Sequence, residues 1–311
     1  MTSIVYVAIY AGLLIFVAGC LRRILEYART PLHLRWELYP VPHEEPQRVE
    51  HGGSYFESGE WWLSPQAVHH GRELRVMFQE IVFLKGLREY NPRLWISSFF
   101  FHFGLYLSIV TIALITVVTL PSVVIANKET ARLAGAVVPI CRWMGSAAAI
   151  LVLAGAILLL LRRISDPELQ NYTKAGDIFN LLFFIIAFGF LTAGSLTHAP
   201  NTASTLEIAR GLLRFDRSVS IAKSFGVGLV LASALVAYIP FTQMSHFIAK
   251  YFTYHSVRWD DRRNERGSTI EKKVAVYLNY KPTWAAPHVG ADGKKSWAEI
   301  ATTNPAEEGR K

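Results

Sequence analysis

The chain has 311 residues, of which 51% are hydrophobic and 18% are charged. This balance is typical of several membrane spans joined to a polar remainder and argues against a single soluble domain. The formal net charge is +8, and the basic residues cluster at the ends of apolar runs. This distribution is typical of residues that orient spans in a membrane, so we expect no nucleic-acid partner.

The first predicted span covers residues 3–20, SIVYVAIYAGLLIFVAGC. Arg22 and Arg23 follow it and no basic region precedes it, which is the reverse of a secretory signal peptide. We therefore expect residues 1–22 to form a retained transmembrane helix whose N-terminus is outside the cell.

A polar, proline- and aromatic-rich segment, residues 23–94, follows as a predicted cytoplasmic loop. Within it, residues 68–90 carry apolar side chains at helical spacing, which predicts an amphipathic helix on the membrane surface or against a partner. His69 and His70 are adjacent, and we interpret them as a neutral surface pair in preference to a metal site.

Four further apolar runs predict membrane helices, and together they make a four-helix membrane core over residues 95–252. These runs cover residues 95–120, 135–161, 177–197 and 223–249.

The positions of the basic residues predict the topology of these spans. Most Lys and Arg residues lie on one side of the alternating spans, with Arg162–Arg163 and Arg258 close to span ends. This bias places that side, together with the C-terminus, in the cytoplasm. We therefore expect a multi-pass protein of the cytoplasmic (inner) membrane.

The C-terminal segment, residues 253–311, is polar but carries scattered Trp and Tyr residues. It lacks the periodic apolar content of a self-supporting core, yet it is too aromatic for an ordinary disordered tail. We interpret it as an extended cytoplasmic arm that becomes ordered on a partner.

Two histidines fall within the predicted spans at similar depth. At 1.5 Å per residue, His102 is about 10 Å and His246 about 8 Å from the cytoplasmic face. Two imidazoles at one depth on neighbouring helices are the ligand set of a b-type haem, so we assign both to haem iron.

Other roles for these histidines stay open. Each side chain is also compatible with a hydrogen-bonded polar residue in a helix interface. The chain would then be a haem-free anchor for catalytic subunits, or a transporter that uses His102, His198 and His246 as a proton relay. No inverted repeat supports the transporter.

Three short motifs resemble the membrane cytochrome b (gamma) subunit of respiratory nitrate reductases. These are FHFGL in the second span, LLLLRRISDP after the third and PFTQMSH at the end of the fifth. The tail from Trp259 is similar to a branch of that superfamily, the membrane cytochrome b subunit of the sulfite-reduction-associated (Dsr) electron-transfer complex.

The resemblance implies a quinone-linked oxidoreductase subunit that acts only within a complex. It implies electron exchange between menaquinone and a cytoplasmic iron–sulfur subunit related to heterodisulfide reductases. Further membrane and periplasmic cytochrome subunits are implied as partners. This chain has only Cys20 and Cys141, with no CxxC pair, so the iron–sulfur centre belongs to a partner.

In the resembled family, His102 and His246 match the ligands of the haem nearer the cytoplasm. The ligands of the second haem fall on Ile112 and Gly228, which cannot bind iron. We therefore expect one haem b, with His198 the remaining intramembrane histidine for a second.

A quinone site is expected near the outer side of the membrane. His198 can hydrogen-bond a quinone carbonyl and exchange a proton, and Arg142 or Lys223 can stabilise an anionic quinone species. Capping and lipid contact are the alternative roles of all three residues. The expected fold is an all-α, five-helix membrane bundle with a cytoplasmic amphipathic segment and an extended arm.

Overall fold

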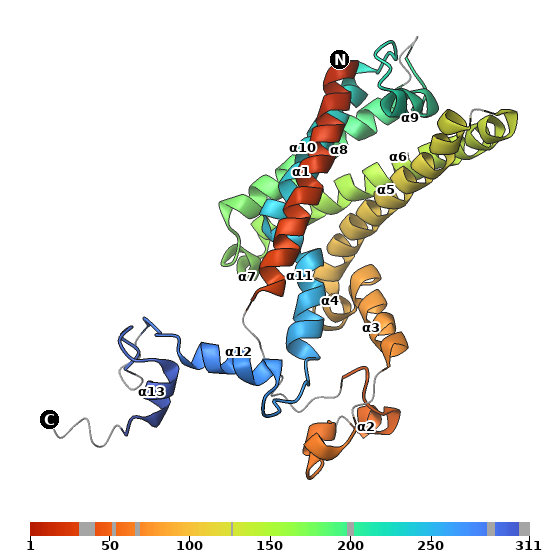
Figure 1. The fold of residues 1–311 in the computed structure, drawn as a ribbon. Helices are drawn as coiled ribbons and strands as arrows, with labels where there is room; N and C mark the ends of the chain where they lie inside the picture. Colours follow the sequence, from red (N-terminus) through yellow and green to blue (C-terminus); the bar gives the residue numbers. More distant parts are fainter. Residues whose placement is uncertain are drawn as a thin grey trace. The chain divides into compact units, whose positions relative to one another are not determined.

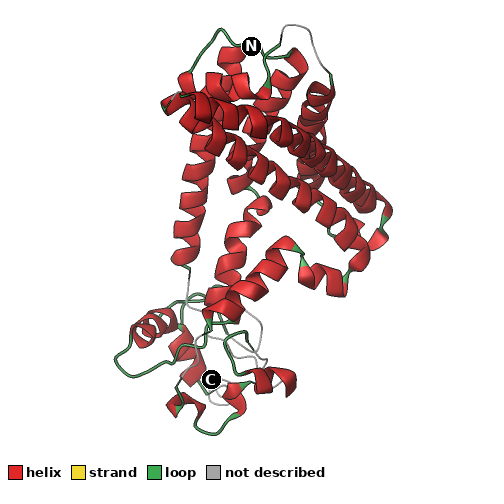
Figure 2. Cartoon of the chain, turned by 90° about the vertical axis from the view of Figure 1, so that its right-hand side faces the viewer, coloured by secondary structure: helices red, strands yellow, loops and turns green. Residues whose placement is uncertain are grey.

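The fold was obtained as a computed structural model, which describes residues 1–30, 41–51, 54–65, 69–125, 127–197, 202–284 and 290–304. Every regular element in these ranges is helical (Figure 2). The all-α prediction is confirmed for this part of the chain. The α-helices are α1 Thr2–Ala28, α2 Pro46–His51, α3 His70–Val82, α4 Lys85–Tyr90, α5 Pro92–Val124, α6 Lys128–Ser165, α7 Pro167–Gln170, α8 Ala175–Leu196, α9 Thr205–Arg214, α10 Lys223–Tyr238, α11 His246–Thr253, α12 Thr269–Leu278 and α13 Trp297–Thr302.

Five helices in the described ranges are long and apolar enough to cross a membrane. They are α1, α5, α6, α8 and the stretch Lys223–Phe241, which joins α10 to a 3₁₀ turn over Ile239–Phe241. The five-span prediction is therefore confirmed by length and composition. Helix α5 begins with Pro92 and is capped by the Asn91 side chain, which accepts from Leu94 N–H at 3.0 Å.

The chain divides into two compact units. The first, here the membrane unit, comprises Met1–Arg22 and Leu74–Ser245. The second, here the loop–tail unit, comprises Arg23–Glu73 and His246–Lys311. The sequence did not suggest this grouping, in which part of the predicted cytoplasmic loop and the predicted arm belong together.

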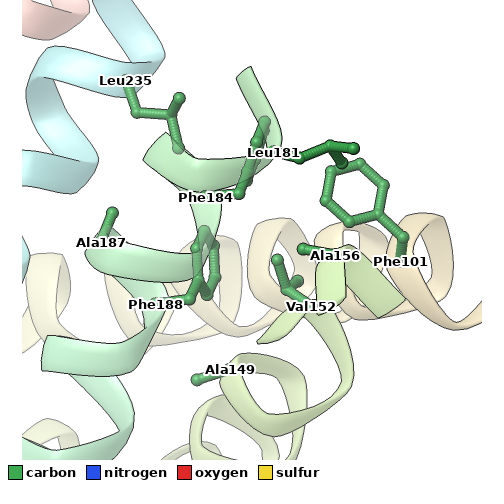
Figure 3. Packing of buried hydrophobic residues seen from close by; sticks show 9 residues of the cluster. All are labelled: Phe101, Ala149, Val152, Ala156, Leu181, Phe184, Ala187, Phe188 and Leu235. Atoms are coloured by element: carbon green, nitrogen blue, oxygen red, sulfur yellow. The ribbon is translucent and has the colours of Figure 1, made fainter. Parts of the chain in front are cut away.

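Within the membrane unit, α5 and α6 run side by side in opposite directions (Figure 1). Helix α8 packs against both α6 and α10. The core lies where these four helices meet, and Figure 3 shows its nine side chains. Phe101 of α5 crosses edge-on to Phe184 of α8, with ring centroids 4.8 Å apart. This contact buries the face of α5 that carries Phe101, next to His102.

Glycines set the closest helix contacts of the bundle. A Cβ at Gly104 of α5 would lie 2.7 Å from the backbone N of Val152 in α6. A Cβ at Gly12 of α1 would lie 2.6 Å from the carbonyl O of Ser233 in α10. Because these neighbours are backbone atoms, only glycine permits the approach, as is common for helices packed in membranes.

Helix α9 covers the end of the bundle at which α10 begins. Its capping box closes the N-terminus, where the Ser204 N–H donates to Glu207 and holds the pKa of that carboxyl below its ordinary value. Arg210 donates from Nε to Ser122 Oγ of α5 at 3.2 Å. Tyr10 of α1 donates to the carbonyl O of Leu212 at 2.7 Å. This helix therefore ties α1 to α5.

The fifth span is shorter than predicted. The sequence predicts one apolar helix over 223–249, whereas α10 ends at Tyr238 and two 3₁₀ turns follow before α11 begins at His246. Pro240 lacks a backbone N–H to continue the α-helical ladder. The Thr242 and Ser245 side chains hydrogen-bond backbone groups of the turns, which satisfies part of the interrupted ladder.

The predicted amphipathic helix is also interrupted. Helix α3 ends at Val82 and α4 starts at Lys85, because Leu84 between them is left-handed with φ 51°. The Glu80 carboxylate accepts from Gly86 N–H at 3.0 Å, which satisfies a donor at the start of α4. The segment is therefore two short helices.

The loop–tail unit is held by polar contacts between distant parts of the sequence. His43 lies between two carboxylates, with Nδ1 3.3 Å from Glu73 and Nε2 2.7 Å from Asp261. Tyr55 also donates to Asp261, at 2.8 Å. The Arg263 guanidinium donates to the carbonyl O of Ser64. The first part of the predicted arm is thus bound to the loop of the same chain.

Candidate functional site

His102 lies on α5 beside the core, with one ring nitrogen already engaged. Its Nδ1 lies 2.7 Å from the carbonyl O of Ser98, one turn earlier, and 3.2 Å from Ser98 Oγ. Because the carbonyl only accepts, Nδ1 carries the proton, and the lone pair of the neutral ring is on Nε2. A histidine that donates its second N–H to a backbone carbonyl is the usual state of a metal ligand. The donor chemistry of His102 therefore fits haem iron.

His246 is the first residue of α11 and belongs to the loop–tail unit, where its side chain is exposed. It lies a few residues past Phe241, where the fifth span ends. The predicted pairing of His102 with His246 joins residues of different units, so it stays a prediction. Within the described ranges, no group of three or more His, Cys, Asp or Glu side chains is arranged to hold a metal ion. A haem with two histidine ligands needs no such group.

A buried polar cluster lies just before His246. Asp177, in the first turn of α8, accepts from the Gln243 side chain and lies 3.5 Å from Arg163 at the end of α6. It also accepts from the Lys174 N–H at 3.0 Å, which caps its own helix. The Asp177 side chain is 8% exposed. This cluster fixes the turn that precedes His246 to two helices of the membrane unit.

The Asp177 cluster leads to a stability prediction. Replacing Asp177 by alanine is expected to destabilise the protein by about 1–3 kcal/mol, because two hydrogen bonds to a carboxylate, from Gln243 and from the Lys174 N–H, are lost. Asn at this position retains an acceptor oxygen, so Asp177→Asn is the matched milder variant. The measurement is thermal unfolding of the purified protein in detergent. Equal midpoints for wild type and Asp177→Ala would contradict the role of this cluster.

The residues predicted for the quinone site are only partly described. His198 lies outside the described residues. Arg142 is exposed on α6, and Lys223 is exposed as the first residue of α10. The quinone site therefore stays a prediction.

Two buried polar groups were not anticipated from the sequence. The hydroxyl of Tyr6 is fully buried beside Ile221, and the amide oxygen of Asn180 is buried on α8; neither has a hydrogen-bond partner in the described part of the chain. Buried polar atoms without partners are rare. Tyr6 lies one turn before Tyr10 on α1, so the two tyrosines share a helix face. This spacing is the signal in the sequence that could have pointed to Tyr6.

Ile112 and Gly228 occupy the two positions at which the resemblance would place the ligands of a second haem. Each has a structural role in this chain. Ile112 is 65% exposed on the outer surface of α5, where a membrane helix meets lipid. A Cβ at Gly228 would lie 2.7 Å from the backbone N of Leu191 in α8. Helix packing therefore excludes any side chain at position 228.

The apolar helices and this helical bundle define a multi-pass, all-α membrane protein. The nitrate reductase gamma subunit family matches residues 89–263, more than half of the chain. The chain therefore belongs to the nitrate reductase gamma subunit family. It is also similar to the Hdr-like menaquinol oxidoreductase cytochrome b-like subunit of Archaeoglobus fulgidus, with 25% identity over 310 residues. That match covers 93% of this chain and 89% of the relative.

Proposed function

We propose that this chain is a membrane cytochrome b that passes electrons between menaquinone and a cytoplasmic iron–sulfur subunit. The single observation that carries the proposal is the hydrogen bond from His102 Nδ1 to the Ser98 carbonyl, which is the contact that a metal-ligating histidine usually makes with its second ring nitrogen. Family membership and the relative's name, a menaquinol oxidoreductase cytochrome b-like subunit, support the same function.

His102 and His246 would hold one haem b, which supplies one-electron transfer when bound. The Ser98 carbonyl orients the His102 ring and keeps its Nδ1 protonated. His198, Arg142 and Lys223 would bind quinone, with His198 holding the proton that is exchanged at a carbonyl oxygen. The tail's similarity to the Dsr complex subunit supports a role in sulfur metabolism. We place the loop–tail unit in the cytoplasm, at the inner membrane, where it would contact the iron–sulfur subunit.

A dithionite-reduced minus oxidised spectrum of the purified chain, with pyridine haemochrome quantification, tests this function. We expect one haem b per chain. Two haems per chain would require a ligand beyond His102 and His246, and His198 would be examined first. Protein prepared with an intact haem supply that contained none would overturn the proposal and favour a haem-free anchor.

A further inference from the structure

Helix α3 exposes three large apolar side chains on one face. Leu74 is 71% exposed, Phe78 57% and Ile81 39%. These three residues, here the apolar stripe, recur at i, i+4 and i+7 and so lie along one side of the helix. The polar residues Gln79 and Glu80 are less exposed than the stripe. This is the reverse of a water-soluble surface helix.

The end of α3 is fixed to a membrane-spanning helix. Tyr106 of α5 donates to the carbonyl O of Ile81 at 2.7 Å, and Trp95 Nε1 of α5 donates to the carbonyl O of Phe83 at 2.8 Å. The last carbonyls of a helix have no partner within it, and here α5 supplies a donor to the carbonyl of Ile81 in the last turn and to that of Phe83 just past the helix end. From Leu74 onward, α3 belongs to the membrane unit together with α5.

These hydrogen bonds place the end of α3 near the membrane surface. Trp95, Phe99 and Phe103 form a stacked row at the start of α5, which is typical of the aromatic belt at a membrane interface. Tyr106 follows Trp95 by about 16 Å along the helix axis at 1.5 Å per residue. Its side chain leans back toward the start of α5, so its hydroxyl lies at a shallower level. Interfacial helices bury their apolar face about 5–10 Å into the headgroup and acyl boundary.

The charges beside the apolar stripe are mainly basic. Arg75 is exposed next to Leu74, and Arg88 of α4 stacks over the Trp95 ring at 5.4 Å. The acidic neighbours are engaged within the chain, since Glu73 pairs with His43 and Glu80 accepts from an amide of α4. An apolar stripe flanked by arginines matches the surface of a bilayer that contains anionic lipids.

We propose that α3 and α4 form an interfacial anchor. The apolar stripe inserts into the leaflet at the N-terminal end of α5, and Arg75 and Arg88 bind the phosphate groups of anionic phospholipids. This anchor fixes the level of α5, and with it His102, relative to the membrane surface.

Spin labelling of the full chain in nanodiscs tests the insertion. Cys20 and Cys141 are replaced by serine, and a nitroxide is attached through Phe78→Cys, Leu114→Cys or Asp292→Cys in separate samples. Leu114 is exposed on the middle of α5 and reports lipid, whereas Asp292 is exposed in the loop–tail unit and reports water. We expect the label at 78 to collide with oxygen more often than with a water-soluble nickel chelate. The label at 114 is expected to show the same preference.

Two outcomes of this experiment would overturn the anchor. Preferential collision with nickel would place the stripe in water, and protection from both reagents would mean that protein covers it. The headgroup part is tested by binding of fluorescent phosphatidylglycerol to the full chain in detergent. Each of Arg75→Gln and Arg88→Gln is expected to weaken binding about fivefold, and Arg266→Gln in the loop–tail unit serves as control. Unchanged affinity in both variants would overturn that part.

Discussion

Replacing His102 by alanine is expected to abolish the reduced haem b spectrum of the purified protein. An iron held between two imidazoles loses half of its protein ligands when one is removed, and alanine offers no substitute. His246→Ala is expected to have the same effect. The measurement is the haem-to-protein ratio by pyridine haemochrome, together with the reduced minus oxidised spectrum.

Matched variants separate ligand loss from misfolding. His102→Gln retains an amide N–H that can donate to the Ser98 carbonyl, so the helix contact is kept while the ligand is lost. Ser98→Ala removes a hydroxyl 3.2 Å from Nδ1 but leaves the carbonyl in place, so this variant should keep its haem. His69→Ala, at an exposed histidine of the loop–tail unit, is the neutral control. A normal haem content in His102→Ala or His246→Ala would refute the assignment.

The spans could be predicted from the sequence because about 20 consecutive apolar residues leave few other structures open to the chain. The break in the fifth span was harder to place. Pro240 marks it, but proline is tolerated in many membrane helices, and α5 and α6 continue past Pro121 and Pro139. The turn after Pro240 is accompanied by side-chain hydrogen bonds of Thr242 and Ser245 to backbone carbonyls, which no periodicity reveals.

The loop–tail unit was missed for a related reason. Its contacts join polar residues far apart in the chain, such as His43 with Asp261, and leave no apolar repeat in either segment. The contact of Asp177 with Gln243 is equally invisible in the sequence, because each residue reads as an ordinary polar residue at a span end. The sequence predicted His102 as a haem ligand from its residue type and its depth in the span. Only the structure showed that its Nδ1 donates to the Ser98 carbonyl.

The close contact of α5 with α6 leads to the second large effect. A Cβ at Gly155 of α6 would lie 2.6 Å from the Cα of Phe101, the residue before His102. Because the obstructing atom is backbone, the helices themselves must separate, and the core around Phe101 and Phe184 opens with them. Overpacking of this kind lowers the free energy of unfolding by about 1–3 kcal/mol. A side-chain atom that meets backbone is expected at the upper end of this range or beyond it.

Gly155→Val is therefore expected both to lower the thermal midpoint of the purified protein and to reduce its haem content. The haem content falls because His102, the predicted ligand, moves with Phe101. Gly135→Val is the matched control, because it introduces the same side chain in the same helix at a position with nothing within 4 Å. The two variants differ only in what the new Cβ meets. If both unfold at the wild-type temperature with full haem content, the glycine contact does not set the position of His102. If Gly155→Val loses stability but retains its haem, the packing of α5 on α6 and the binding of haem are independent.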